Sequence, residues 1–457
     1  MKLSLILFVV VALLVAPHTF LVAPVSAQRE AAQADGRRHL ILCVDGVGFS
    51  MIEEMRREGH FKIFNQPSRM IAPFPTLTNV SMTEILRPAG ADETTGYEDS
   101  FYDTGKNRLR GGLLDRFNDR SFIHGTFREL FDYHPSALKS GLGYAAPPAS
   151  TYIEALSDLL RLRQKFNNSK EPTYFAYTGA SDSLAHVGGA RLVRSFLARL
   201  DDTLGRIIRD GAWQIDVTVF SDHGNHFRKY RRAELKHALE RANFRLEPEL
   251  RNERSVVLPQ FGLVGCAVLF TRETNEPALA ASLINVRGVD FAAYEKSGIV
   301  YVVNRKGEAR IEERDARLRY VAERGDPLEL SSVIEQLKAN RKADTDGFAT
   351  GEDWFEATQN NPRIDAVRRI YEGLTAHVRN RANVIVNLED GYYTGSRTLD
   401  VFTFLQATHG NIGQEQSSGF VMSTKENLPS SIRAADLWRI IGSPRLHKSL
   451  TEAHQRD

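Results

Sequence analysis

Cysteine is scarce in this sequence, with only two among 457 residues, Cys43 and Cys266. A chain of this length can bury enough apolar surface to fold without disulfides, so a disulfide scaffold is not required. Both cysteines lie in apolar stretches that are typical of strands. We therefore predict two buried thiols, while their spacing leaves one disulfide between them open.

An excess of charge of either sign is also missing. The chain has 59 Lys and Arg against 57 Asp and Glu, which gives a formal net charge of +2. Nucleic-acid-binding domains concentrate positive charge, so this balance gives no support for a nucleic-acid partner. Internal repeats and low-complexity tracts are absent from the sequence, and 42% of the residues are hydrophobic. This composition is typical of a globular protein.

Long apolar runs are confined to the N-terminus. Lys2 precedes an apolar run from Leu3 to Val15, and small residues follow up to Ala27. This order is typical of a secretory signal peptide, which we predict over residues 1–27. An uncleaved membrane anchor is the alternative, because residues 3–28 carry no charge and could just span a bilayer. We expect a secreted or periplasmic protein with no membrane span after signal removal.

Short apolar runs alternate with helical patterns along the rest of the chain. Ser50 and Glu53 form a capping-box pattern ahead of one helix. This alternation predicts an α/β fold, with a mainly parallel sheet flanked by helices. The predicted strands span residues 39–44, 173–177, 215–220 and 383–387, and the predicted helices span 51–58 and 191–209.

The pattern changes in the last third of the chain. Residues 299–303 and 308–311 flank a turn sequence and predict a hairpin. Residues 320–380 are highly charged and mostly helical in pattern. We therefore predict a catalytic core formed by residues 28–310 and 381–457, with an inserted or edge lobe at 311–380.

Five short motifs place polar side chains at strand ends or in the loops beyond them. Ligands of parallel α/β sheets bind at this edge, so we expect these side chains to meet. Their mixture of carboxylate and imidazole suits Zn²⁺ better than Ca²⁺, which prefers oxygen alone. The candidates are Asp45 in VDGVG, Thr78 in FPTLTN, Asp182 and His186 in DSLAH, Asp222 and His223 in SDHGN, and His409 in ATHGN.

Each motif alone has an ordinary structural explanation. An Asp after a strand is often a turn or cap residue, and Thr78 could cap a helix that begins at 79–81. Asp182 and His186 could simply face each other on one helical turn. Gly46 and Gly224 follow two of the motifs and would let backbone approach a bound ion. The coincidence of all five motifs at one sheet edge favours a site.

The order of these motifs resembles the alkaline phosphatase superfamily, and most closely its type I phosphodiesterase and nucleotide pyrophosphatase branch. The resemblance extends from about Leu40 to Gly410, with the middle lobe matching least. It implies two divalent metal ions, of which Zn²⁺ is the expected species. It also implies that Thr78 attacks a phosphoryl group and becomes phosphorylated.

The resemblance assigns each candidate a place. It implies one metal held by Asp182, His186 and His409, and a second held by Asp45, Asp222 and His223, with the Thr78 oxygen also on the second. Asn79 follows the nucleophile and would donate to a phosphoryl oxygen. The nucleotide pyrophosphatases instead place an Asn three positions after their Thr, where this chain has Ser81.

The predicted function is a secreted, metal-dependent phosphohydrolase that acts on a small phosphorylated substrate. A phosphodiesterase or nucleotide pyrophosphatase is the first reading, and a phosphomonoesterase of the same superfamily is the alternative. A binding protein that keeps the fold without catalysis is the alternative from a different class. A sulfatase is disfavoured, because nothing after Thr78 fits its pattern of Pro two residues later and Arg beyond.

Basic residues follow the SDHGN motif closely. Arg228, Lys229, Arg231 and Arg232 could bind an anionic substrate or form a solvated charged helix face. We favour the helix face. The sequence does not define the oligomeric state.

Overall fold

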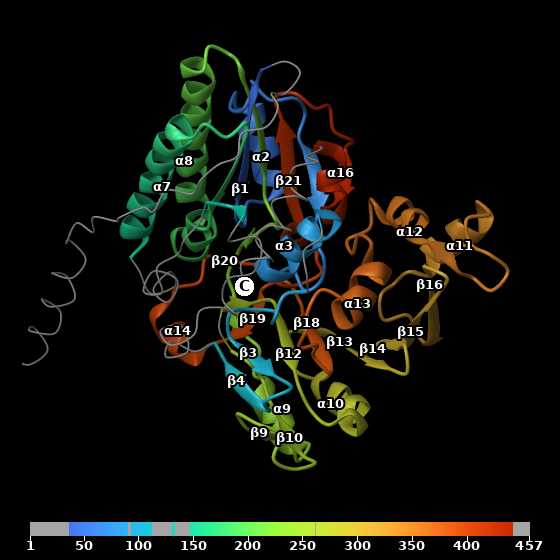
Figure 1. The fold of residues 1–457 in the computed structure, drawn as a ribbon. Coiled ribbons are helices and arrows are strands. Elements are labelled where there is room, and N and C mark those ends of the chain that lie inside the picture. Colours follow the sequence, from blue (N-terminus) through green and yellow to red (C-terminus); the bar gives the residue numbers. More distant parts are fainter. Residues whose placement is uncertain (1–35, 90–92, 112–129, 133–146, 261, 442–457) are drawn as a thin grey trace, which may run out of the picture. The chain divides into compact units, whose positions relative to one another are not determined.

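The computed structural model describes residues 36–89, 93–111, 130–132, 147–260 and 262–441 (Figure 1). The predicted signal peptide at 1–27 lies outside these residues. No helix of the described ranges has the length and apolar character needed to cross a membrane.

The strands predicted from the short apolar runs 39–44, 173–177 and 215–220 lie in one six-stranded sheet. Its order is β22-β2-β21-β6-β1-β5, and β1 pairs in parallel with both β5 and β6. Only β21 runs against its neighbours, because it pairs antiparallel with β6 and β2. The mainly parallel sheet is therefore confirmed. The strands are β1 (Arg38–Val44), β2 (Ser68–Ile71), β5 (Thr173–Thr178), β6 (Ile215–Phe220), β21 (Ser418–Ser423) and β22 (Ser431–Arg433).

Helices cover both faces of this sheet (Figure 1). Leu40 and Leu42 of β1 pack on one side with α2 (Phe49–Arg57), α7 (Pro148–Asn168) and α8 (Ala180–Asp210). Successive strand residues point to opposite faces. Ile41 and Cys43 therefore pack on the other side, against α3 (Thr78–Leu86) and α16 (Leu437–Ile441). The continuous apolar run of β1 reflects burial on both faces, as predicted.

Two local predictions need correction. Helix α2 follows Gly48, which makes no side-chain cap, and Ser50 lies inside the helix and donates to Glu415 Oε2 at 2.9 Å. The predicted capping box is therefore wrong. Helix α8 starts at Ala180, well before the predicted start at residue 191, because Gly189 (φ +73°) kinks the helix without ending it. The early part of α8 carries two of the candidate site residues.

A second, seven-stranded sheet has the order β12-β18-β13-β14-β15-β16-β17, and every neighbouring pair is antiparallel. The predicted strand at 383–387 is present as β18 but lies in this sheet. A continuous apolar run reports burial on both faces and does not reveal partner direction. The hairpin β14–β15 is confirmed. The strands are β12 (Cys266–Leu269), β13 (Val289–Lys296), β14 (Ile299–Asn304), β15 (Gly307–Arg314), β16 (Arg317–Arg324), β17 (Ala349–Thr350) and β18 (Val384–Leu388).

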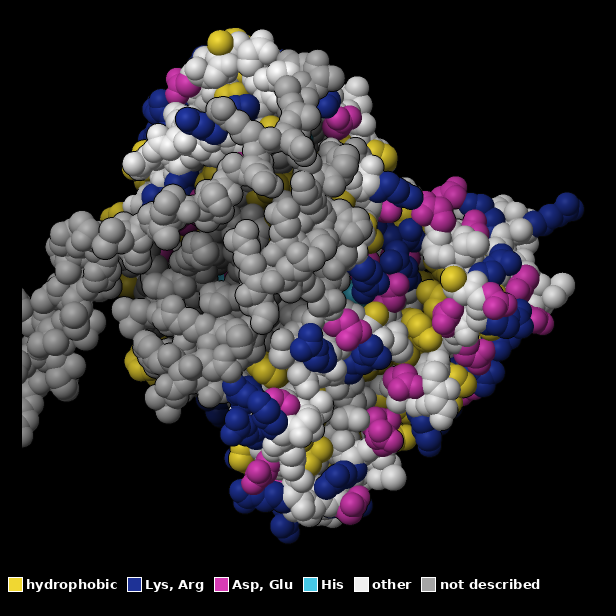
Figure 2. Space-filling model, in the orientation of Figure 1, with side chains coloured by type: hydrophobic (Ala, Val, Ile, Leu, Met, Phe, Trp, Pro, Cys, Tyr) yellow, Lys and Arg dark blue, Asp and Glu magenta, His cyan; other side chains and the backbone are white. Residues whose placement is uncertain are grey.

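Helices also cover the second sheet. Helices α11 (Ser331–Ala339), α12 (Gly351–Thr358) and α13 (Ala366–Thr375) share one core with it, and α9 (Leu235–Arg241) and α10 (Glu276–Leu283) share another. Basic and acidic side chains intermingle over β15 and β16, as in the pairs of Arg310 and Arg319 with Glu312 (Figure 2). The proposed lobe at 311–380 begins inside β15.

Short elements complete the described chain. Both cysteines are buried free thiols, as predicted. The remaining strands are β3 (Phe101–Asp103), β4 (Arg108–Arg110), β7 (His226–Phe227), β8 (Arg231–Arg232), β9 (Arg245–Leu246), β10 (Ser255–Val256), β11 (Leu263–Val264), β19 (Tyr392–Gly395) and β20 (Ala407–Thr408), and the remaining helices are α14 (Arg397–Phe402) and α15 (Gln414–Ser417), with three short 3₁₀ turns at 87–89, 273–275 and 434–436.

Candidate metal centre

Three carboxylates converge at one edge of the parallel sheet. Asp45 follows β1, Asp222 follows β6, and Asp182 lies in the first turn of α8, just after β5. Because β6, β1 and β5 are parallel neighbours, their carboxyl ends meet at the same edge. The strand order therefore brings together side chains that are far apart in sequence.

The glycines beside these motifs make room for neighbouring protein atoms. A Cβ on Gly46 (φ +69°) would lie 2.4 Å from Asp182 Oδ1, so this glycine makes room for a carboxylate. A Cβ on Gly224 would lie 2.2 Å from the Glu415 carbonyl oxygen. Gly224 therefore packs on backbone.

The three histidines are held in the same way. Their Nδ1 atoms lie next to backbone carbonyl oxygens, of Ala407 for His186 (2.8 Å), Thr76 for His409 (2.7 Å) and Gly224 for His223 (3.1 Å). A carbonyl oxygen can only accept, so each Nδ1 carries the proton. In the neutral ring, Nε2 is then left with a lone pair, the form that binds metals.

The Nε2 atoms face the carboxylates. His186 Nε2 lies 3.1 Å from Asp182 Oδ2, and His409 Nε2 lies 3.8 Å from Asp182 Oδ1. His223 Nε2 lies 3.5 Å from both Asp45 Oδ1 and Asp222 Oδ2. The rings of His223 and His409 stack at 4.0 Å. The structure thus brings all six candidate Asp and His residues into one continuous group.

Thr78 joins this group from α3. It is the first residue of the helix, and its Oγ1 lies 3.3 Å from His223 Nε2. The N-cap is Leu77, so Thr78 is not the capping residue that the sequence allowed as an alternative. Asn79 follows in the same turn, and its Nδ2 donates to Asp99 Oδ1 at 3.4 Å.

Burial dominates the electrostatics of the site. Burial, followed by the charges of Asp222 and Asp182, raises the pKa of Asp45 well above its usual value, and burial raises the pKa of Asp222 to about 7. Burial also opposes ionisation of Asp182, but the adjacent His186 and His409 outweigh it and lower its pKa. Carboxylates crowded in this way need a nearby positive charge.

The residues fit a bound dication. Asp45 Oδ1 and Asp222 Oδ2 are buried without a hydrogen-bond partner, which is costly unless another group binds them. No Lys or Arg among the described residues forms an ion pair with the three carboxylates. Two ligand sets have atoms within 4.8 Å of one another, Asp182, His186 and His409, and Asp45, Asp182 and His223. This mixed donor set suits Zn²⁺.

Several supporting residues were not assigned from the sequence. Tyr177 donates its hydroxyl to Asp45 Oδ2 at 2.5 Å. Asn225 Nδ2 donates to Asp182 Oδ1 at 2.7 Å and to the Gly46 carbonyl at 2.9 Å. Asn225 lies within the SDHGN motif, and Tyr177 ends a predicted strand. The sequence therefore indicates that both residues lie near the site, but not which side chains they contact. Their partners depend on pairing between distant segments.

The chain is similar to murine and human ectonucleotide pyrophosphatase/phosphodiesterase 5, at 13% and 12% identity and TM-scores of 0.45 and 0.47, covering 89% of this chain and 94% of each structure. An inactive variant of the murine protein in complex with AMP matches at 13% identity and TM-score 0.46, covering 90% and 95%. No protein-family model and no curated protein matches the chain. At this identity, activity has to be judged from the residues themselves.

Proposed function

We propose that this chain is a two-metal phosphohydrolase that works through a phospho-threonine intermediate. The supporting observation is the position of Thr78 Oγ1, 3.3 Å from His223 Nε2, at the edge of a buried group of three Asp and three His. Asp182, His186 and His409 would hold one ion, and Asp45, Asp222 and His223 the other. This arrangement combines a nucleophile with metal-ligand side chains, and no Lys or Arg of the described residues pairs with its carboxylates. A purely structural cluster would not need the nucleophile.

The proposed chemistry follows from what each side chain can do. Phosphoryl transfer needs positioning and charge stabilisation more than covalent help. Bound Zn²⁺ ions would stabilise the Thr78 alkoxide and neutralise phosphoryl oxygens. Thr78 Oγ1 attacks phosphorus, the bond from phosphorus to the leaving oxygen breaks, and the leaving group departs. Attack by water on the phospho-threonine then restores the free hydroxyl and releases phosphate or a phosphomonoester.

The first turn of α3 supports this role. Backbone N–H groups at a helix N-terminus point towards an anion placed there, and Thr78 occupies that position. Asn79 would donate from the same turn to a phosphoryl oxygen if its Nδ2 turns away from Asp99, 3.4 Å away. We therefore assign Asn79 an oxyanion-binding role secondary to that of the metal ligands.

A direct test uses Thr78→Ala with Thr83→Ala as its matched control. Thr83 lies on the same helix, and its hydroxyl bonds to the Asn79 carbonyl at 2.8 Å. We expect Thr78→Ala to lower turnover about a thousandfold or more while keeping both metals, because only the nucleophile is removed. The control keeps its activity. Brief exposure to substrate followed by acid quench and mass spectrometry should find phosphate on the peptide containing Thr78.

The substrate class is tested separately. We propose a phosphodiester or nucleotide pyrophosphate, with a phosphomonoester as the alternative. Chromogenic mono- and diesters with the same leaving group compare the two directly, and the larger kcat/KM identifies the class. If metals bind but neither substrate is hydrolysed, the result favours the alternative hypothesis of a binding protein with this fold.

We also propose that the mature protein is secreted or periplasmic, on the basis of the predicted signal peptide at 1–27. N-terminal sequencing of the protein recovered from its native compartment would locate cleavage. A mature chain that still begins at Met1 would contradict this proposal.

A further inference from the structure

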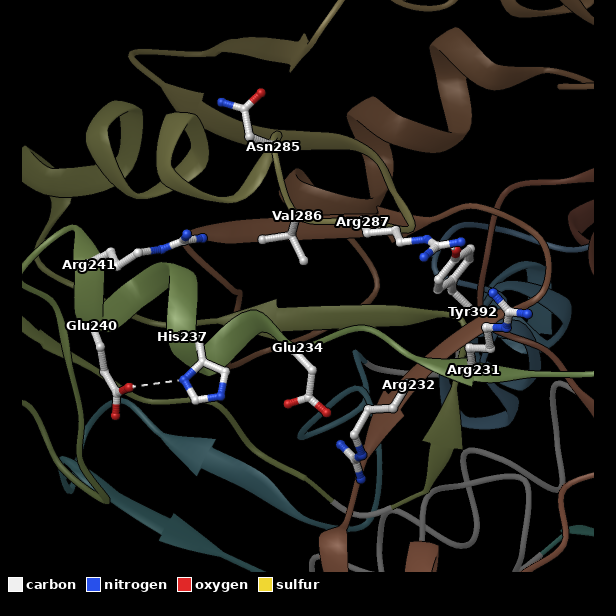
Figure 3. Close-up of a pocket in the computed structure, with 10 residues that line it drawn as sticks. All are labelled: Arg231, Arg232, Glu234, His237, Glu240, Arg241, Asn285, Val286, Arg287 and Tyr392. Carbon is white, nitrogen blue, oxygen red and sulfur yellow. Dashed lines mark hydrogen bonds and ion pairs between the residues drawn. The ribbon is translucent and has the colours of Figure 1, made fainter.

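A second polar pocket lies away from the metal centre. It has a volume of about 800 Å³ and is lined by residues of β8, α9, the segment 285–287 and β19 (Figure 3). None of its lining residues belongs to the seven candidate site residues. Arg231 and Arg232 of its wall come from the basic segment predicted as a helix face. That prediction is wrong, because this part of the segment pairs with β19 as strand β8.

The strand pairing positions a cationic group around one aromatic ring. Arg231 is the register partner of Tyr392, so their side chains project from adjacent strands. Arg287 approaches the same ring from another segment, and its Nε donates to the Tyr392 hydroxyl at 3.0 Å. Figure 3 shows Arg231 and Arg287 on either side of Tyr392, with Arg241 at the far end of the pocket.

The wall behind Tyr392 is closely fitted. Tyr392 packs over Gly288, where an added Cβ would lie 2.2 Å from the ring. Gly288 also has φ +88°, a conformation that other residues rarely adopt. The ring therefore has a fixed backing, and its hydroxyl faces Arg287.

These arginines lack acidic partners. No carboxylate of the described chain forms an ion pair with Arg231, Arg241 or Arg287. Of the two acidic lining residues, Glu234 instead binds Arg397 at 2.9 Å, and Glu240 lies 3.5 Å from His237 Nδ1. Two guanidinium groups held beside one ring repel each other unless an anion lies between them. Guanidinium forks match the geometry of phosphate oxygens.

We propose that this pocket is a second anion site, which binds the phosphoryl group of a small phosphorylated compound through Arg231 and Arg287, the two arginines that flank Tyr392. The volume suits a small molecule. Tyr392 offers its hydroxyl to the ligand and its ring to an attached apolar or planar group. The site does not depend on the metal centre and would act as an accessory or regulatory site.

The test measures binding to the metal-loaded protein by isothermal titration calorimetry, with inorganic phosphate in one arm and AMP in the other. Arg231→Gln/Arg287→Gln removes the two charges. Arg57→Gln/Arg206→Gln removes two exposed arginines from α2 and α8 and serves as the charge-matched control. We expect the pocket variant to lose one binding event, with affinity at that site lowered about tenfold or more, while the control binds as wild type.

Turnover separates this site from the metal centre. Phosphate bound at the metals would compete with substrate, and that inhibition should be the same in the pocket variant as in wild type. Tighter binding of AMP than of phosphate identifies an ester as the ligand, and the reverse identifies free phosphate. If the pocket variant keeps the stoichiometry and affinity of wild type for both probes, the proposal is wrong, whatever the outcome at the metal centre.

Discussion

The candidate metal centre and a second buried cluster, formed by Glu84, Glu372 and His377, contain the same kinds of side chain. Both bring potential ligand atoms within 4.8 Å of one another. Both also include a buried carboxylate oxygen without a hydrogen bond, such as Glu84 Oε2 in the second cluster. Residue type and spacing alone therefore do not separate a metal site from a structural one.

The two clusters differ in the positively charged side chains that lie beside their carboxylates. In the second cluster, Arg368 binds Glu84 at 3.2 Å and Glu372 at 2.9 Å, and Arg87 lies 3.3 Å from Glu84. The cluster thus supplies its own cations. The carboxylates of the candidate metal centre form no ion pair with Lys or Arg among the described residues. A bound metal ion would supply the positive charge that these residues leave out.

The orientation of the histidine rings also distinguishes the two clusters. Arg87 donates to His377 Nδ1, so this nitrogen is the acceptor and the proton of the neutral ring lies on Nε2. The three histidines of the candidate metal centre have the opposite tautomer, with the proton on Nδ1 and the lone pair on Nε2. A metal site can thus be distinguished by the hydrogen bond at Nδ1 of each imidazole, which decides whether Nε2 carries a lone pair.

The largest expected effect comes from removing metal. Chelation should abolish turnover, and Zn²⁺ should restore it, because no Lys or Arg in the described part of the chain pairs with the three carboxylates. The melting temperature should also fall, since ions that bind only the folded state stabilise it. Activity assays and calorimetry before and after metal replacement measure both effects. Full activity after exhaustive chelation would rule out the two-metal proposal.

A pair of histidine variants compares the two clusters directly. His409→Ala leaves Asp182 and His186 as a two-ligand site, and catalytic Zn²⁺ normally has three protein ligands. We expect fewer than two metals per chain and a loss of rate of about a hundredfold or more, with melting changed only modestly. His377→Ala should keep both metals. Elemental analysis measures the stoichiometry.

Two full metals in His409→Ala would overturn the place of His409 in the site. His226 would then be the next candidate, although its Nδ1 lies 2.5 Å from Asp390 Oδ2. Loss of metal in His377→Ala would show that the second cluster also binds an ion.

The grouping of the candidate site residues could be predicted because they sit in short motifs after apolar strands. Asp45 and Asp222 were placed correctly by the end of a strand alone. The parallel sheet followed from the same runs. The cause is local, since a buried parallel strand has an unusually continuous apolar pattern.

Other features depend on tertiary contacts that no local pattern reports. The strand at 384–388 has the same apolar pattern as β1 but joins an antiparallel sheet. The second cluster joins Glu84 of α3 to His377 beyond α13, and neither residue lies in a recognisable motif. The pairing of Arg231 with Tyr392 likewise comes from segments about 160 residues apart, as the register shows.

Removing the internal cation of the second cluster should destabilise the fold. Arg368→Met leaves the buried Glu84 beside the half-buried Glu372 with one arginine fewer, and we expect a loss of about 3 kcal/mol in the free energy of unfolding. Arg314→Met is the control, because Arg314 forms an exposed pair with Asp344 and should cost under about 1 kcal/mol. Urea denaturation measures both. Equal losses in the two variants would remove the distinction between the clusters.

The smallest effect is a pH dependence that only the second cluster explains. Burial, followed by the charge of Arg87, lowers the pKa of His377 to about 3, below its usual value of 6.5. Between these values the unfolded chain binds a proton that the folded chain does not, so acid favours unfolding. His377→Asn removes this titration, and Asn tolerates the positive φ of 66° at this position. Between pH 6.5 and pH 5, wild type should lose about 2 kcal/mol more stability than the variant, as followed by urea unfolding at several pH values. Other buried histidines titrate in both proteins and cancel in the difference. Parallel curves for the two proteins would mean that His377 is protonated in the folded state, and the arginines would then not account for its tautomer.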